Sequence, residues 1–269
     1  MSATERPIGA FDSGVGGLTV VQAMRELLPS EDILYLGDTA RVPYGNKSPE
    51  TIIRYSREIM TYLRSHEVKA VVVACNTASA HALARLQKEA DIPVIGVIAP
   101  GVEAALSATR NGRVGIIGTH GTIQSEAYQN MLRLKCPDVV ITAVAAPLLV
   151  SLVEEDWLSH QATLLILEEY LAPMKEREVD TVVLACTHYP LLKPLAQRVL
   201  GPGVVLVDSA QNAAAALARE LSRIGLNRAT SSIAGKITIC ATDYPPHFSR
   251  LAERFLGEKI GGIEQVAVG

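Results

Sequence analysis

Several features that mark specialised classes of protein are scarce in this sequence. Aromatic residues make up only 4% of the 269 residues, which is too few for a surface that stacks nucleic-acid bases. The 25 Lys and Arg residues are balanced by 28 Asp and Glu residues, so the formal net charge is -3, and like charges form no run of five. The strongly basic surface of a nucleic-acid-binding protein is therefore not expected.

Long apolar stretches are also scarce. The longest covers residues 139–153 and contains Pro147, whereas a membrane-spanning helix needs roughly twenty apolar residues. The first residues, MSATERP, contain no apolar segment of the kind that directs secretion. We therefore expect no membrane association and a cytoplasmic location.

Cysteine is rare as well. The four cysteines lie 61, 50 and 54 residues apart, at Cys75, Cys136, Cys186 and Cys240. They form no CxxC pair, so neither a zinc site nor a redox dithiol is expected. Four cysteines in a chain of this length also do not indicate a disulfide-stabilised fold. We expect reduced thiols and no bound metal.

The sequence is rich in apolar residues, 48% of the total, and they occur in a regular alternation. Amphipathic segments predict helices; residues 18–28 have helical apolar spacing before Pro29, and Ser48 followed by Pro49 is a typical helix start. Between them, short apolar runs predict buried parallel strands at 8–11, 33–36, 70–74, 94–97, 114–117, 139–143, 181–185, 204–207 and 237–240. This order predicts an α/β fold with mostly parallel sheets and helices on both faces.

The two halves of the sequence resemble each other. Residues 71–80 read VVVACNTASA and residues 182–191 read VVLACTHYPL, an offset of 111 that aligns Cys75 with Cys186. Two further pairs of segments match in the same order, 7–14 with 113–120 and 94–106 with 204–217. Three matches in one order predict two similar, duplicated α/β units.

Cys75 and Cys186 each follow the carboxyl end of a predicted strand, which is where open α/β sheets bind ligands. A helix that begins just after each cysteine would favour its thiolate. If the two halves are related by a pseudo-twofold axis, the two thiols lie on opposite sides of a cleft. Such a pair suits either a reversible disulfide switch or inversion at carbon, in which a thiolate removes a proton from one face and a thiol delivers one to the other. Cys136 and Cys240 are interpreted as packing residues.

Other polar segments are further candidates. Residues 12–17, DSGVGG, lack the spacing of a dinucleotide or P-loop motif, but their backbone N–H groups suit a carboxylate. Asp12 is either a helix cap, a partner of Cys75 or a group that holds a substrate ammonium. Residues 38–48, with Pro-Tyr-Gly at the centre, form either a plain turn or a binding loop. His188 is a candidate acid–base or carboxylate-binding residue, whereas the acidic residues 154–156 are typical of a solvated cluster.

Four motifs resemble those of the glutamate racemases in the aspartate/glutamate racemase family. They occur in the family's order and spacing and span nearly the whole chain: FDSGVGGLTV (11–20), GDTARVPYG (37–45), ACNTASA (74–80) and ACTHYPLL (185–192). The resemblance implies two α/β domains, residues 1–98 plus 208–269 and residues 99–207, related by a pseudo-twofold axis with the active site in the cleft between them. It also implies an isomerase that interconverts L- and D-glutamate without pyridoxal phosphate or another cofactor. Such a bacterial enzyme supplies D-glutamate for peptidoglycan synthesis, and so for cell-wall biogenesis and cell shape.

The resemblance further implies roles for individual residues. Cys75 would abstract the α-proton of D-glutamate, and Cys186 would abstract that of L-glutamate. Asp12 and His188 would assist the two thiols, and Glu154 would orient the histidine. The residues implied to bind substrate are Asp12, Ser13, Pro43, Tyr44, Gly45, Asn76, Thr77, Thr119, Thr187 and His188.

Two alternatives stay open at this point. Related aspartate and hydantoin racemases share the two-cysteine pattern, although the Thr-His-Tyr-Pro after Cys186 resembles the glutamate branch. The chain could thus act on aspartate or another acidic amino acid, or Cys75 and Cys186 could form a non-catalytic thiol switch. The expected partner is the small molecule glutamate, not a nucleic acid or a membrane. A homodimer is one candidate assembly.

Overall fold

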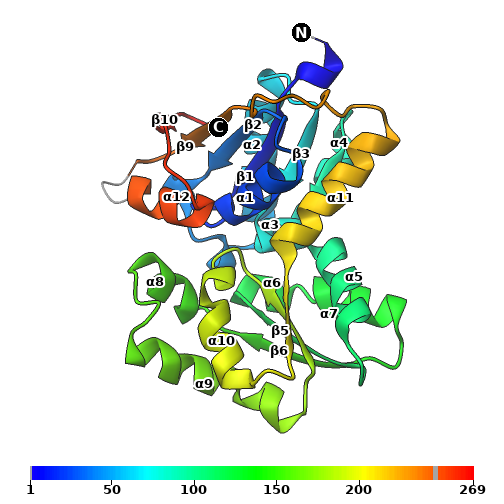
Figure 1. The fold of residues 1–269 in the computed structure, drawn as a ribbon, viewed down its shortest axis with the longest axis vertical. Helices are drawn as coiled ribbons and strands as arrows, with labels where there is room; N and C mark the ends of the chain where they lie inside the picture. Colours follow the sequence, from blue (N-terminus) through cyan, green and yellow to red (C-terminus); the bar gives the residue numbers. More distant parts are fainter. Residues whose placement is uncertain (1, 245–247) are drawn as a thin grey trace. The chain divides into compact units, whose positions relative to one another are not determined.

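The strands form two separate sheets in the computed structural model, which describes residues 2–244 and 248–269 (Figure 1). One sheet belongs to a unit made of Met1–Val97 and Ala210–Gly269, and the other to a unit made of Ile98–Ser209. All the strand pairs described within these sheets are parallel, and helices separate successive strands. The predicted α/β class is confirmed.

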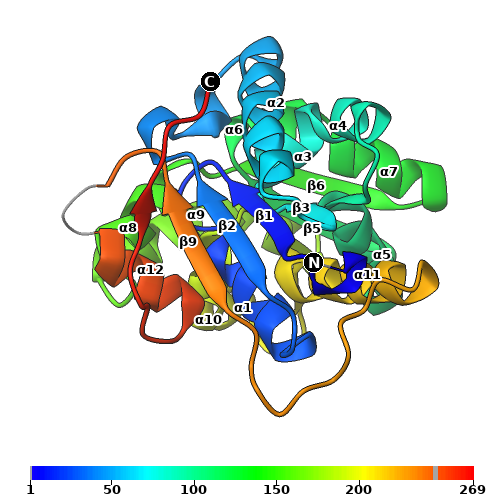
Figure 2. The same cartoon turned by 90° about the horizontal axis from the view of Figure 1, so that it is seen from above.

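The first unit has a six-stranded sheet in the order β10-β9-β2-β1-β3-β4. Its strands are β1 (Ile8–Asp12), β2 (Ile33–Gly37), β3 (Ala70–Val73), β4 (Val94–Gly96), β9 (Ile237–Ala241) and β10 (Glu264–Gln265). Figures 1 and 2 show helices on both faces of this sheet. On one face α1 (Leu18–Leu27) packs against α12 (Phe248–Leu256), and on the other α2 (Pro49–Ser65) packs against α3 (Asn76–His81) and α4 (Leu83–Glu89). The unit also contains α11 (Ser209–Arg223) from Ala210 onward and the 3-10 helices η1 (Ala3–Glu5), η2 (Thr39–Arg41) and η3 (Tyr44–Asn46).

The second unit has a four-stranded sheet in the order β6-β5-β7-β8. Its strands are β5 (Arg113–Gly118), β6 (Val140–Ala145), β7 (Thr181–Ala185) and β8 (Val205–Asp208). One face carries α5 (Ile98–Ala108), α6 (His120–Gln124) and α7 (Ala127–Lys135). The other carries α8 (Leu148–Glu154), α9 (Gln161–Glu176), the 3-10 helix η4 (Tyr189–Leu192) and α10 (Lys193–Leu200) (Figure 1).

The strand order of the second unit repeats that of the first. The order β2-β1-β3-β4 recurs as β6-β5-β7-β8, and β9 and β10 extend the first sheet beyond β2. The aligned segments of the sequence repeat coincide with equivalent strands, because β1 corresponds to β5 and β3 to β7. The repeat that the sequence predicts is therefore also a repeat of topology.

The structure confirms the strands and the helix start at Ser48 that the sequence predicts, adds one strand and corrects one helix. All nine predicted strands are present, and Ser48 caps α2 by accepting a hydrogen bond from the Thr51 N–H at 3.3 Å. The short strand β10 was not predicted. The helix expected directly after Cys186 is wrong: a turn and η4 come first, and α10 begins only at Lys193. An α-helix that began directly after Cys186 would have Pro194 in its interior, where proline removes a backbone hydrogen bond, whereas proline is tolerated in the first turns of η4 and α10.

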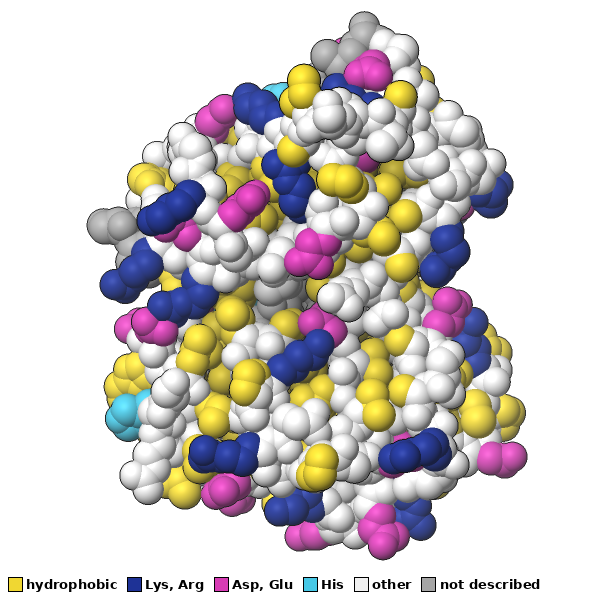
Figure 3. Space-filling model, viewed as in Figure 1, with side chains coloured by type: hydrophobic (Ala, Val, Ile, Leu, Met, Phe, Trp, Pro, Cys, Tyr) yellow, Lys and Arg dark blue, Asp and Glu magenta, His cyan; other side chains and the backbone are white. Residues whose placement is uncertain are grey.

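The distribution of charge on the surface agrees with the nearly equal numbers of basic and acidic residues in the sequence. On the face shown in Figure 3, Lys and Arg side chains are interspersed with those of Asp and Glu. Among residues 2–244 and 248–269, every helix is too short or too polar to cross a lipid bilayer.

Candidate active site

Each sheet presents one cysteine at the point where its strand order changes direction. The chain leaves β1 for β2 on one side and later returns to β3 on the other, so the carboxyl ends of β1 and β3 border a switch point. Asp12 ends β1 and Cys75 follows β3 by one intervening residue. In the second unit Thr119 follows β5 and Cys186 follows β7, and the register pairs Gly118 with Ala185 just before them. Open α/β sheets bind ligands at this place.

Cys75 is buried at the start of α3. Its side chain is the N-cap of that helix: Sγ accepts a hydrogen bond from the Ala78 N–H at 3.4 Å. Sγ also lies 3.8 Å from Ser13 Oγ. Asn76 and Thr77 form the first turn of α3 and are buried beside it. The first unit thus gathers the predicted residues Ser13, Cys75, Asn76 and Thr77 at one edge of its sheet.

The environment of Cys75 does not favour the thiolate in the way that the sequence suggested. Burial, followed by the negative charge of Asp12, raises the pKa of Cys75 to about 12. The hydrogen bonds from Ala78 and Ser13 act in the opposite direction and are outweighed. The expectation that a helix start leaves this cysteine as a thiolate is therefore wrong, because desolvation of the sulfur dominates. The ligand-free thiol holds its proton at neutral pH.

Asp12 is the last residue of β1, where the tight loop that leads to α1 begins. It is 1% exposed, and its Oδ2 accepts a hydrogen bond from the Gly14 N–H at 3.1 Å. A Cβ on Gly17 would lie 2.5 Å from the Asp12 Cβ, so only glycine allows the loop to pass this closely. The N-cap of α1 is Gly17, which means that the helix-cap interpretation of Asp12 is wrong.

Tyr35, in β2, was not predicted as part of this region. It is fully buried, and its hydroxyl donates a hydrogen bond to the Gly14 carbonyl at 2.6 Å. Burial, followed by the charge of Asp12 and a smaller electrostatic contribution from Cys75, raises the pKa of Tyr35. One signal was present in the sequence: a tyrosine inside an otherwise apolar strand has a hydroxyl that must find a partner when it is buried.

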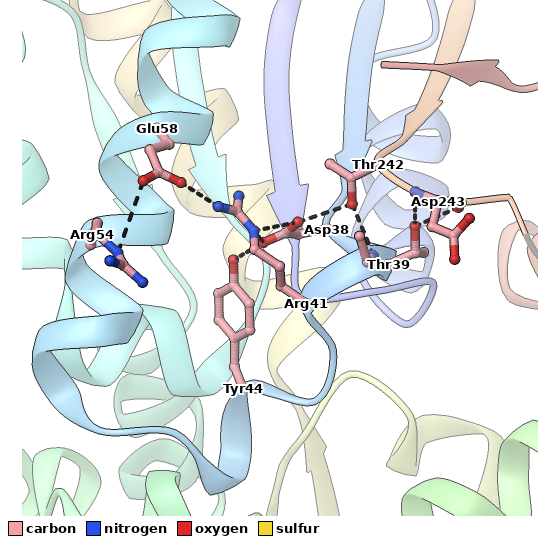
Figure 4. A network of polar contacts seen from close by, with 9 residues as sticks. Asp38, Thr39, Arg41, Tyr44, Arg54, Glu58, Thr242 and Asp243 are labelled. Carbon is pink, nitrogen blue, oxygen red and sulfur yellow. Dashed lines mark hydrogen bonds and ion pairs between the residues drawn. The ribbon is translucent and has the colours of Figure 1, made fainter. Parts of the chain in front are cut away.

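The loop after β2 contains the predicted residues Pro43, Tyr44 and Gly45. Pro43 is exposed, whereas Tyr44 and Gly45 are buried in η3. The Tyr44 hydroxyl donates to the carboxylate of Asp38, a fully buried residue that was not predicted as a site residue (Figure 4). Burial and the charge of Asp38 raise the pKa of Tyr44. Cys75 raises this pKa by a smaller amount, so its sulfur is close enough to the phenol to act on it electrostatically.

In the second unit Cys186, His188 and Glu154 form a chain of contacts. Cys186 Sγ lies 3.9 Å from His188 Nδ1, and His188 Nε2 lies 2.9 Å from Glu154 Oε1. Thr187 Oγ1 is 3.4 Å from His188 Nδ1. Glu154 is the last residue of α8 and is partly buried, so the interpretation of residues 154–156 as a solvated cluster is wrong for this side chain.

The contacts of His188 keep its ring positively charged. Burial alone would lower its pKa, but hydrogen bonds with Cys186 and Glu154, together with electrostatic attraction to both groups, raise it to about 10. At neutral pH the imidazolium therefore pairs with Glu154 through Nε2 and directs Nδ1 toward Cys186. This arrangement suits a residue that gives a proton to the sulfur side of the site, or stabilises charge there.

Thr119 has a local structural contact at the same edge of the second sheet. It is the N-cap of α6, and its Oγ1 accepts a hydrogen bond from the Thr122 N–H at 3.3 Å. All four cysteines are free thiols, and Cys240 is buried in the apolar core. In the part of the chain that the structure describes, His, Cys, Asp and Glu side chains form no group of three that could hold a metal ion.

Comparisons with known proteins agree on one family. The model of the family described as Asp/Glu/Hydantoin racemase matches residues 17–217. The chain is 49% identical over 263 residues to a glutamate racemase from Geobacter metallireducens, covering 98% of this chain and 97% of the relative. Its fold is similar to a crystal structure of a glutamate racemase isoform from Bacillus anthracis (TM-score 0.94, 38% identity, 98% of both chains). It is also similar to glutamate racemase from Francisella tularensis in complex with D-glutamate (TM-score 0.92, 38% identity, 98% of both chains).

Proposed function

Because the chain belongs to the Asp/Glu/Hydantoin racemase family, we propose that it interconverts L-glutamate and D-glutamate by a two-base mechanism that needs no cofactor. The observation that carries this proposal is the pair of buried, free cysteines at equivalent switch points of two sheets with the same topology. D-Glutamate is a component of bacterial peptidoglycan, so the reaction serves cell-wall synthesis. Free thiols suit a reducing compartment, which supports a cytoplasmic location.

Inversion at the α-carbon requires one proton-transfer group for each face of the substrate. In the D-to-L direction the Cys75 thiolate takes the α-proton, and the electron pair of the broken C–H bond remains on the substrate as a carbanion. The Cys186 thiol then delivers its own proton to the opposite face. The reaction ends with Cys75 as a thiol and Cys186 as a thiolate, and the L-to-D direction restores the first state.

The raised pKa of Cys75 fits a demanding proton abstraction. An α-proton next to an ionised carboxylate is very weakly acidic, and a thiolate whose conjugate acid has a pKa of about 12 is a stronger base than an ordinary thiolate. We assign Asp12 to the substrate ammonium group. When this cation binds, it offsets the charge of Asp12 and removes one of the two causes that disfavour the thiolate.

The other predicted residues are assigned to the substrate carboxylates and to the second thiol. Backbone N–H groups near Ser13, Asn76 and Thr187 are suited to stabilise the charge that develops on the α-carboxylate, at about 3 kcal/mol for each well-placed donor. Pro43, Tyr44, Gly45, Thr77 and Thr119 complete the proposed substrate contacts. His188, held by Glu154, assists Cys186.

The direct test uses glutamate in D₂O with no added cofactor. We expect the wild-type protein to abolish the optical rotation of either enantiomer and to incorporate deuterium at the α-carbon. Cys75→Ala and Cys186→Ala should each lower racemisation by at least about a thousandfold, because each removes one proton-transfer group. Cys136→Ala is the matched control, since it removes a free thiol that lies just after α7.

Each outcome is decisive. Full racemisation by either Cys75→Ala or Cys186→Ala would exclude the two-base mechanism. Absence of deuterium exchange in the wild-type protein would favour the thiol switch. A parallel panel that includes aspartate tests substrate choice, and faster turnover of aspartate than of glutamate would contradict the proposed substrate.

A further inference from the structure

The loop that carries Tyr44 is fastened to a part of the chain about two hundred residues away. Thr242 lies one residue beyond the end of β9, and β9 is the neighbour of β2 in the first sheet. The Thr242 hydroxyl donates a hydrogen bond to Asp38 Oδ1 at 3.0 Å and accepts one from the Ala40 N–H, also at 3.0 Å (Figure 4). This single hydroxyl therefore joins the side chain and the backbone of the loop.

Asp38 is the centre of the network. Its carboxylate is fully buried and accepts hydrogen bonds from Arg41 Nε at 2.9 and 2.7 Å, in addition to those from Thr242 and the Tyr44 hydroxyl. Arg41 continues the network to Glu58 on α2 (Figure 4). A buried carboxylate is stable only when its oxygens are paired in this way.

A second clamp lies beside the first. The Thr39 hydroxyl donates to the Asp243 carbonyl at 2.5 Å and accepts from the Asp243 N–H at 2.7 Å. The Thr242 N–H also donates to the Gly37 carbonyl at 3.1 Å. Two consecutive residues after β9 thus hold the start of the loop through both side chain and backbone.

We propose that Thr242 is a positioning residue for substrate binding, acting through Asp38 on the Tyr44–Gly45 segment. The inference rests on the proposed function, which assigns this segment to glutamate. Tyr44 is 1% exposed and its hydroxyl is bound to Asp38, so the phenol anchors the loop, and the segment meets the substrate through its backbone. Loss of the Thr242 hydroxyl leaves Asp38 with fewer donors and the loop with more conformations. Only part of that population binds substrate, so the apparent affinity falls.

Three variants test the role of the hydroxyl. Thr242→Val keeps the branched shape and removes the hydroxyl, Thr242→Ser keeps the hydroxyl, and Thr238→Val makes the same chemical change within β9, opposite Leu34. We expect Thr242→Val to raise the KM for both enantiomers about fivefold while kcat stays within about twofold of wild type; the KM change corresponds to roughly 1 kcal/mol. Thr242→Ser and Thr238→Val should both stay close to wild type.

A second readout does not depend on activity. Amide hydrogen exchange of a peptide covering residues 38–47 should be faster in Thr242→Val than in wild type, Thr242→Ser or Thr238→Val. Thr242 is only half-buried, so the substitution is compatible with folding, which a thermal melt verifies.

The outcomes separate this inference from the proposed function. If the wild-type protein does not racemise glutamate, the proposed function fails, and the assignment of Thr242 to substrate binding fails with it even if the exchange data show an anchor. If the wild type is active but Thr242→Val matches it in KM and in exchange, only the inference is overturned. A Thr242→Ser variant as impaired as Thr242→Val would also overturn it, because side-chain shape rather than the hydroxyl would then be responsible.

Discussion

Replacing Asp12 with asparagine should make Cys75 more reactive while making the protein a poorer racemase. The charge of Asp12 is the second cause, after burial, that raises the pKa of Cys75 to about 12. Asparagine keeps the size of the side chain and removes its negative charge. The pKa of Cys75 should therefore fall, but burial should keep it above that of an exposed cysteine. Racemisation should fall because the partner proposed for the substrate ammonium group loses its charge.

The expected change in thiol reactivity follows from the thiolate fraction. With a pKa of about 12, about one Cys75 side chain in ten thousand is a thiolate at pH 8. Removing the neighbouring like charge is worth roughly one pKa unit, which gives about ten times more thiolate. Each thiolate becomes about threefold less nucleophilic as its pKa falls. The net expectation is a roughly threefold faster alkylation of Cys75.

The assay is alkylation by iodoacetamide at pH 8, followed by digestion and mass spectrometry of the peptide that contains Cys75. Cys240 is an internal control in the same digest, because burial and its neighbours Tyr62 and Glu264 determine its pKa. Ser13→Ala is the matched control variant. The Ser13 side chain lowers the pKa of Cys75, so its removal should slow alkylation.

The two variants are expected to change the rate of Cys75 alkylation in opposite directions, which distinguishes an effect of charge from a loosened loop. If a substitution merely loosens the loop, both variants should speed alkylation of Cys75. Unchanged or slower alkylation in Asp12→Asn, relative to Cys240, would show that the charge of Asp12 does not oppose the thiolate. Undiminished racemisation in Asp12→Asn would remove Asp12 from the proposed mechanism.

Two further predictions concern the neighbours of the two thiols. Because the folded pKa of His188 is raised to about 10, its protonation stabilises the fold fully below the ordinary histidine pKa near 6.5 and ceases to do so as the pH rises through about 10. Glu154→Gln should lower this pKa, so that denaturant unfolding from pH 6 to 11 shows the loss of stability at lower pH; an unchanged profile would contradict the role of the Glu154 contact. Gly17→Ala should destabilise the protein by roughly 1–3 kcal/mol and lower activity, since its Cβ would lie 2.5 Å from that of Asp12. Gly203→Ala, where nothing lies within 4 Å, should be neutral, and equal melting temperatures for the two variants would contradict this account.

The central strands β1, β2, β3 and β7 could be predicted from the sequence because every one of their residues is buried in a parallel sheet. Continuous apolar runs such as 70–74 are compatible with few structures other than a buried strand, and the sequence repeat then relates β3 to β7. β10 is different. Its residues, Glu264 and Gln265, are exposed and polar, and it joins the sheet through backbone pairing with β9. Side-chain patterns carry no signal for such a strand.

The positions of the candidate residues could be predicted better than their environments. Cys75 and Cys186 were found because the repeat aligns them, and Glu154 was found only through family resemblance. Tyr35 and Thr242 were missed. Thr242 lies 204 residues from Asp38 in sequence, and their contact exists only because β9 pairs with β2. Contacts of this kind depend on sheet order, which local spacing does not contain.

The two thiols occupy equivalent places in the topology but have different electrostatic neighbours. A carboxylate, Asp12, opposes ionisation of Cys75, whereas a cationic His188 lies beside Cys186. For a racemase the equilibrium constant between enantiomers is unity by symmetry, so kcat/KM must be the same in both directions whatever the two thiols do. The different neighbours can therefore affect kcat and KM only in compensating amounts for each enantiomer. The neighbours of the two thiols leave the equilibrium between the enantiomers unchanged. They determine only which enantiomer binds more tightly and turns over more slowly.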